Sequence, residues 1–183
     1  MERRKLLQII GLVAGGSVLF GGGLYIGIQI GQPNFRLSPQ GNSELQQNGA
    51  RVVISYSRPY ARDREIFGGV VPYGKVWRTG ANEATTLVTD RELFLGDARV
   101  PAGEYSLYTI PKPNGWTLIV NRQTGHFGNV YKEKEDLLRV EIGAGASRQH
   151  IEQFTIRFDE TARGTLLHFE WESTRASVPV RLG

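Results

Sequence analysis

The chain has 183 residues, 40% of them hydrophobic, with 8 Phe, 7 Tyr and 3 Trp, and a formal net charge of +4. This aromatic content excludes a disordered chain, and the absence of cysteine excludes disulfides, thiolate metal sites and cysteine nucleophiles. From residue 51 onward, 18 basic residues stand against 16 acidic ones, so no dense basic stripe is present and we expect no nucleic-acid partner.

An uncharged N-terminal segment, 6–30, follows the basic residues Arg3, Arg4 and Lys5. As a helix it would extend about 38 Å, which is enough to cross a hydrocarbon core of about 30 Å. The positive-inside rule leaves its basic end in the cytoplasm. We therefore expect residues 1–31 to form a membrane anchor or export signal, a single transmembrane or signal helix. The rest of the chain would lie on the periplasmic or extracellular side of the cytoplasmic membrane.

Two features of this segment bear on export and assembly. Its start, Arg3-Arg4-Lys5-Leu6-Leu7, resembles the twin-arginine export signal, and small residues at 14–16 resemble a cleavage site. The apolar stretch continues well past residue 16, which favours an uncleaved anchor. Glycines spaced by four, such as Gly11 and Gly15, share a helix face and are typical of an anchor-mediated homodimer, although glycine is also common in export signals.

Residues 32–49 are rich in Gln, Asn, Ser, Pro and Gly, and we expect them to form a flexible linker before a domain at 50–183. That domain contains short segments of strand-like alternation with turn signals between them, and no long helical period. The expected strands are 52–57, 84–89, 92–95, 105–110, 116–121, 138–142, 154–158, 165–171 and 176–182. This pattern predicts an all-β fold, an antiparallel β-sandwich or jelly roll, with a small closed barrel as the alternative.

The strand expected at 165–171 has a clear inner and outer face. Leu167, Phe169 and Trp171 alternate with polar residues and are predicted to line the core. The same alternation predicts that His168, Glu170 and Glu172 point outward.

One stretch, 57–86, is long for a sandwich connection and concentrates charged and aromatic side chains. Long ordered loops on rigid β-scaffolds often carry function. We therefore expect a ligand site here, and its candidate residues are Arg58, Tyr73, Trp77, Arg78, Asn82, Glu83 and Thr85.

The same stretch carries a family resemblance. Arg58-Pro59, Ile66-Phe67-Gly68, Val71-Pro72-Tyr73-Gly74 and the run VWRTGANEATT at 76–86 resemble the bacterial family of domain of unknown function 2911. The likeness continues through PAGEYSLYTIP at 101–111 and WTLI at 116–119, and it covers about 51–182. It implies one exported domain and supplies no catalytic residues.

Each candidate side chain has a functional and a structural interpretation. Arg58 and Arg78 suit a bidentate site for a carboxylate or phosphate, or else they pin the loop to backbone carbonyls and Glu83. Glu83 is a possible general acid or base, or an ion-pair partner. Trp77 and Tyr73 would stack on a sugar or aromatic ligand, or pack in the core.

No cofactor or metal site is expected. His126, His150 and His168 lie in separate elements without the spacing of metal ligands, although a three-histidine site assembled by the fold is an alternative. Three functions remain open, and the first is preferred: a binding module of the cell envelope for a small anionic or sugar-like ligand. The others are an enzyme, a hydrolase or isomerase that uses Glu83 with arginine or histidine partners, and a structural domain without a small-molecule site.

Overall fold

A computed structural model of the chain describes residues 37–183, and this part is all-β, as the sequence predicts. Its elements are β1 Gln40–Gln47, β2 Ala50–Ser57, β3 Thr85–Thr89, β4 Leu93–Leu95, β5 Ala98–Val100, β6 Gly103–Lys112, β7 Gly115–Asn121, the short 3₁₀ helix η1 Glu133–Glu135, β8 Asp136–Thr161 and β9 Gly164–Leu182. Across 37–183, no helix has the length and apolarity needed to cross a membrane. The segment 6–30, expected to do so, lies outside the described residues.

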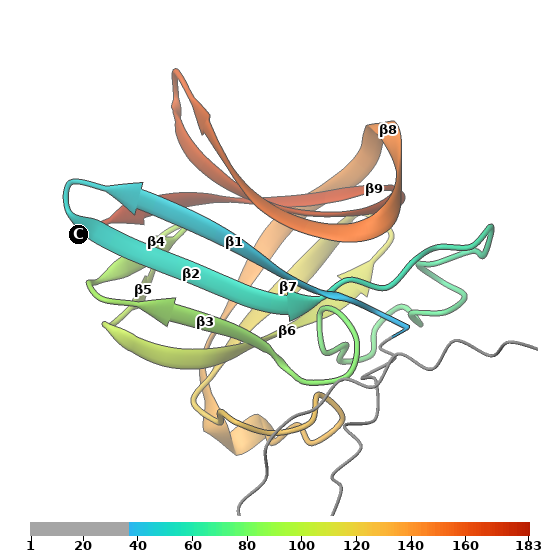
Figure 1. Cartoon of the computed structure of the whole chain (residues 1–183), viewed down its shortest axis with the longest axis horizontal. Helices are drawn as coiled ribbons and strands as arrows, with labels where there is room; N and C mark the ends of the chain where they lie inside the picture. Colours follow the sequence, from blue (N-terminus) through green and yellow to red (C-terminus); the bar gives the residue numbers. More distant parts are fainter. Residues whose placement is uncertain (1–36) are drawn as a thin grey trace, which may run out of the picture. The chain divides into compact units, whose positions relative to one another are not determined.

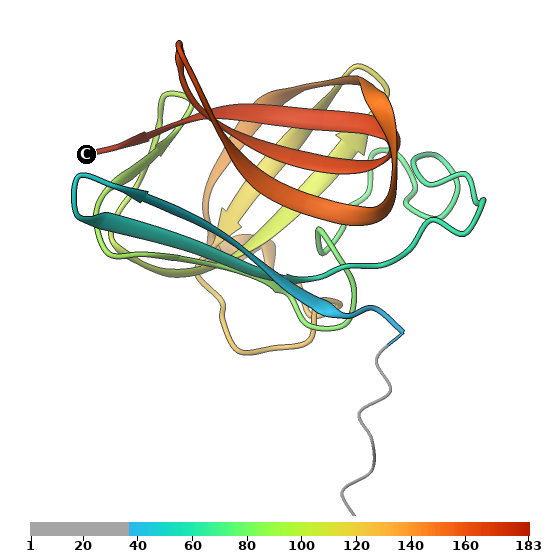
Figure 2. The ribbon, with the colours of Figure 1, turned by 45° about the horizontal axis from the view of Figure 1, so that its top comes forward.

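The nine strands form one antiparallel sheet in the order β1-β2-β3-β6-β7-β8-β9-β4-β5 (Figure 1). Strand β8 joins its two halves, because residues 136–142 pair with β7 and residues 143–161 pair with β9. The long β8–β9 hairpin forms a second, sandwich-like layer (Figure 2). The two layers are thus parts of one sheet that bends along a shared strand.

Strand β1 lies within the range expected to be a flexible linker. It pairs with β2 along its whole length, from Gln40 opposite Ser57 to Gln47 opposite Ala50. The connecting residues Asn48 and Gly49 both have positive φ, as a two-residue hairpin turn requires. The folded domain therefore begins before residue 50, and the expected linker loses its second half to β1.

The expected strands 138–142 and 154–158 are parts of β8, and 165–171 and 176–182 are parts of β9. The gaps between them coincide with irregularities, because the β8–β9 register shifts between residues 146 and 155 and Glu172 has a φ of 53°. Such bulges reverse which residues face the core. Leu167, Phe169 and Trp171 are buried, as expected, whereas beyond Glu172 the buried positions are Ala176, Val178 and Val180.

An aromatic cluster fills the space between the layers. It comprises Phe67, Trp77, Trp116, Phe154 and Trp171, with neighbouring ring centroids 4.7 to 6.3 Å apart. Aromatic rings of this size dominate the burial of apolar surface in a core. Because two of the rings come from 57–86, this stretch is part of the core and not a loop attached to it.

The free edge of β8 is closed by the end of β2 and by the chain that follows it. The Tyr56 hydroxyl accepts from the Ile156 amide at 2.8 Å and donates to the Ile156 carbonyl at 3.1 Å. Further along the same edge, Phe154 N–H donates to the Pro59 carbonyl at 2.9 Å and Ala61 N–H donates to the Glu152 carbonyl at 2.7 Å. Both layers are therefore joined by hydrogen bonds at this side as well as through β8.

Replacing Tyr56 by Phe tests this closure. The variant keeps the ring but leaves both backbone groups of Ile156 without a partner in a buried place, so we expect a loss of about 1–3 kcal/mol in the free energy of unfolding. Urea unfolding of the full-length protein, followed by tryptophan fluorescence, measures it. Tyr105→Phe is the matched control, since that hydroxyl donates only to the Pro101 carbonyl. Equal losses in both variants would contradict a special role for Tyr56.

Candidate functional site

The stretch 57–86 is fixed along the edge of β6. Trp77 and Thr109 exchange backbone hydrogen bonds of 2.7 and 2.9 Å, and Gly74 N–H donates to the Pro111 carbonyl at 2.9 Å. The Trp77 ring stacks on Trp171 with centroids 5.8 Å apart. Trp77 therefore takes the core position that was one of its two interpretations, although one side of it lines a pocket described below.

Two of the polar candidates, Thr85 and Asn82, fix the conformation of the run 77–86 together with their neighbour Thr79. Thr85 is fully buried and donates to the Thr79 carbonyl at 2.7 Å, and the Thr79 hydroxyl lies 3.1 Å from that of Thr109. Asn82 donates from its amide to the Ser57 hydroxyl at 3.3 Å. Thr79 and Asn82 both have positive φ, which is unusual for a β-branched residue such as threonine. Such backbone persists only where its surroundings fix it, and Thr85 and Asn82 provide that fixing.

Arg58 is bound to β8 and lines none of the four described pockets. Its Nε donates to the Phe154 carbonyl at 3.2 Å and its Nη2 donates to the Thr155 hydroxyl at 3.0 Å. A Cβ at Gly41 would overlap its side chain, so the arginine is also enclosed from β1. These contacts match the structural interpretation of Arg58 as a pin.

A pocket of about 280 Å³, here called the arginine pocket, lies on one side of the run 77–86. Its wall combines three guanidinium-bearing residues with aromatic ones: Arg62, Arg64, Arg78, Tyr60, Trp77 and Trp171. Arg64 is engaged with the Ala61 and Tyr60 carbonyls at 2.8 and 2.7 Å. Arg78 makes no hydrogen bond or ion pair to any residue within 37–183, and its aliphatic part lies against Gly128.

A larger pocket of about 690 Å³, here called the histidine pocket, lies on the other side of the same run. Its wall includes Ser55, Ser57, Glu83, Thr86, Glu104, His126 and Phe127. His126 Nε2 lies 2.7 Å from the Tyr108 hydroxyl, whereas Nδ1 is buried without a partner among the described residues. Sequence reasoning considered His126 only for a three-histidine metal site and not beside Glu83, because the contacts that place it here, such as that with Tyr108, join distant parts of the chain.

The seven candidate residues therefore do not share one pocket. Trp77 and Arg78 line the arginine pocket, and Glu83 lines the histidine pocket. Tyr73 lines a separate cavity of about 230 Å³ beside Trp116, while Arg58, Asn82 and Thr85 are structural contacts around the run. The structure does bring Glu83 and His126 to one pocket, as the enzyme hypothesis requires.

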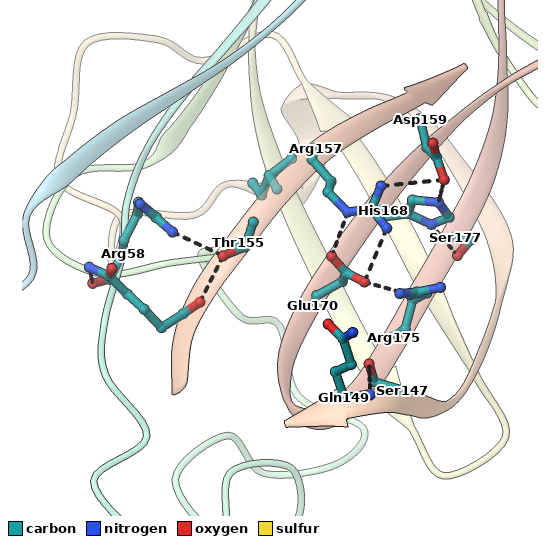
Figure 3. A network of polar contacts seen from close by, with 12 residues as sticks. Arg58, Ser147, Gln149, Thr155, Arg157, Asp159, His168, Glu170, Arg175 and Ser177 are labelled. Atoms are coloured by element: carbon teal, nitrogen blue, oxygen red, sulfur yellow. Dashed lines mark hydrogen bonds and ion pairs between the residues drawn. The ribbon is translucent and has the colours of Figure 1, made fainter. Parts of the chain in front are cut away.

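The densest polar cluster lies elsewhere, on the face of the β8–β9 hairpin opposite the core (Figure 3). Glu170 accepts from Arg157 Nε at 2.8 Å and from Arg175 Nε at 2.5 Å. His168 Nδ1 lies 2.7 Å from the Ser177 hydroxyl, and its Nε2 lies 3.4 Å from Asp159. His168 and Glu170 were expected to point outward. They do leave the core, but only 3% and 2% of their surfaces are exposed, because these neighbours cover them.

Serine, histidine and aspartate are the residue types of a hydrolytic triad, yet this cluster is closed. None of the four described pockets is lined by Asp159, His168 or Ser177. Burial, and then the charges of Arg157 and Arg175, lower the pKa of His168, so the imidazole is neutral near pH 7. Burial alone would raise the pKa of Glu170, but the hydrogen bonds and charges of the two arginines outweigh it and hold this pKa below its ordinary value. The cluster therefore stabilises the hairpin.

Acidification should destabilise the fold through this cluster. In the unfolded chain this histidine binds a proton near its ordinary pKa of 6.5, whereas folded His168 does so only at lower pH. The contribution of neutral His168 to the free energy of unfolding is therefore complete above pH 6.5 and is lost as the pH falls towards the pKa of the folded state. Glu170 adds a second loss below its ordinary pKa of 4.5. Urea unfolding from above pH 6.5 to below pH 4.5 measures both losses in the free energy of unfolding. His168→Gln should remove most of the loss that begins below pH 6.5.

Removing the central carboxylate gives a complementary prediction from the same cluster. Glu170→Gln leaves two arginines without their buried partner, and we expect a loss of about 2–3 kcal/mol in the free energy of unfolding. Asp159→Asn is the control, because Asp159 is 44% exposed and solvent screens its ion pair with Arg157, so a smaller loss is expected. Similar losses in both variants would contradict the central place of Glu170.

No group of three metal-ligating side chains occurs within residues 37–183. His126 contacts Tyr108, His150 lies near Glu152 and Glu172, and His168 belongs to the closed cluster. The three histidines thus occupy three different environments.

Comparison with known proteins gives one match. The sequence pattern of the family described as "Protein of unknown function (DUF2911)" matches residues 38–180, which is most of the chain and nearly all of the described domain. No curated protein and no solved structure matches the chain.

Proposed function

For this chain, which belongs to the family described as protein of unknown function (DUF2911), we propose a non-catalytic binding function, with a small anionic ligand in the arginine pocket. The observation that carries the proposal is Arg78, a partly buried residue that lines this pocket and whose guanidinium has no carboxylate partner among residues 37–183. An accessible guanidinium with unpaired donors at a pocket wall is a suitable partner for a carboxylate or phosphate.

The composition of the pocket supports an anion in particular. Three arginines line it and no aspartate or glutamate among the described residues does, although Glu152 accepts from the Arg62 backbone amide nearby at 2.9 Å. The planar fork of arginine fits a carboxylate or phosphate with two parallel hydrogen bonds. Trp77 and Trp171 form an apolar wall, and Trp171 Nε1 is a buried donor with no acceptor among the described residues.

Arg78→Lys tests this function. Lysine keeps the charge and loses the planar fork, so we expect binding of inorganic phosphate or citrate to weaken about tenfold, while unfolding without ligand changes little. Titration calorimetry on the full-length protein at constant ionic strength measures it. Arg91→Lys, at an exposed position that lines none of the four described pockets, is the matched control. The proposal fails if the wild-type protein binds neither anion, or if both variants bind alike.

We further propose that the domain is held outside the cytoplasm by residues 6–30. The support is the uncharged stretch that follows Arg3, Arg4 and Lys5.

Protease added to cells with a permeabilised outer layer should degrade the domain while cytoplasmic control proteins stay intact. Replacing Arg3 and Arg4 by lysine should block export if the twin-arginine route is used. A domain as protected as the cytoplasmic controls would contradict the placement.

A further inference from the structure

The histidine pocket is separate from the arginine pocket and differs from it in size and chemistry. Its volume of about 690 Å³ lies within the usual range for small-molecule sites. No residue lines both pockets, because the run 77–86 turns its Trp77 end to one and its Glu83 end to the other. A ligand that binds in one pocket therefore does not contact the residues that line the other.

The charge of the histidine pocket is opposite to that of the arginine pocket. Glu83 and Glu104 line it, and within residues 37–183 no lysine or arginine does. Carboxylates that face an anion repel it, whereas they accept hydrogen bonds from hydroxyl and amino groups. Ser55 and Thr86 add hydroxyl groups, which both donate and accept. This set of groups suits a ligand with several hydroxyls and no negative charge.

An exposed aromatic ring stands at the same pocket. Phe127 is 57% exposed although it lies in an ordered segment, and its backbone pairs with that of Glu83. A phenyl ring in water is unfavourable, and an apolar ligand face that covers it is favourable. The C–H face of a sugar ring is such a surface, while its hydroxyls point sideways to polar groups.

Hydrogen bonds fix both ends of the segment that carries His126 and Phe127. Asn121 donates to the Lys132 carbonyl at 2.9 Å and to Asp136 at 2.8 Å, and the Tyr131 hydroxyl donates to Asp136 at 2.8 Å. Burial and then this bond raise the pKa of Tyr131 to about 12, so it remains a donor. A wall fixed before binding lowers the entropy cost of binding.

The two ring nitrogens of His126 differ, because only Nε2 has a partner among the described residues. The bond to Tyr108 fixes its ring, and a buried Nδ1 without a partner among the described residues destabilises the folded state. From these observations together, we propose that the histidine pocket is a second ligand site, which binds an uncharged or amino sugar.

The test uses three sugars of one ring type that differ in charge: glucose, glucosamine and glucuronate. Titration of the full-length protein by saturation-transfer NMR should show binding of the first two and at least about tenfold weaker binding of glucuronate. Saturating inorganic phosphate should leave glucose binding unchanged, because the phosphate is proposed to bind in the arginine pocket.

Phe127→Ala should weaken glucose binding about tenfold. Val130→Ala should not, since Val130 is exposed on the same segment and does not line the pocket. Absence of glucose and glucosamine binding, equal binding of glucuronate, displacement of glucose by phosphate, or equal effects of the two variants would each overturn the proposal.

Discussion

Strand β8 has two edges, and the fold depends on how the second edge is paired. Its first part pairs with β7 and the rest with β9, which leaves backbone groups near Ile156 and Phe154 directed at the opposite layer. The Tyr56 hydroxyl and the chain at 59–61 take up these groups. Because unpaired backbone groups in a buried place are costly, this closure requires the chain after β2 to cross to β8 before it returns to β3.

That crossing explains the position of the run 77–86. After leaving β8 the chain passes through the aromatic cluster at Trp77 and is fixed to β6 at Thr109. It then has few residues in which to reach β3 at Thr85, and it does so with positive φ at Thr79 and Asn82. Because this path is short, its beginning at Trp77 and Arg78 lines one pocket, while Glu83 near its end lines another. The two pockets are therefore consequences of the same constraint.

Most of the strands were predictable from sequence because apolar residues alternate with polar ones, as at Leu167, Phe169 and Trp171, which are buried. Strand β1 has weak alternation, and its real signal was the Asn48-Gly49 turn, which the polar composition around it concealed. The covering of His168 and Glu170 could not be predicted, because it depends on the bulge at Glu172 that brings Arg175 and Ser177 over them. The single expected site was divided for a similar reason: sequence proximity of Arg78 and Glu83 does not reveal the wall between them.

The separation of charge between the pockets cannot be seen in the composition of the domain. Its 18 basic and 16 acidic residues after position 50 nearly cancel, yet among residues 37–183 the charged residues that line one pocket are arginines and those that line the other are glutamates. Asn82 lies between Arg78 and Glu83 in the sequence, and its amide donates to the hydroxyl of Ser57, a residue that lines the histidine pocket. Under the two proposals, one short segment would thus present surfaces of opposite ligand preference at its two ends.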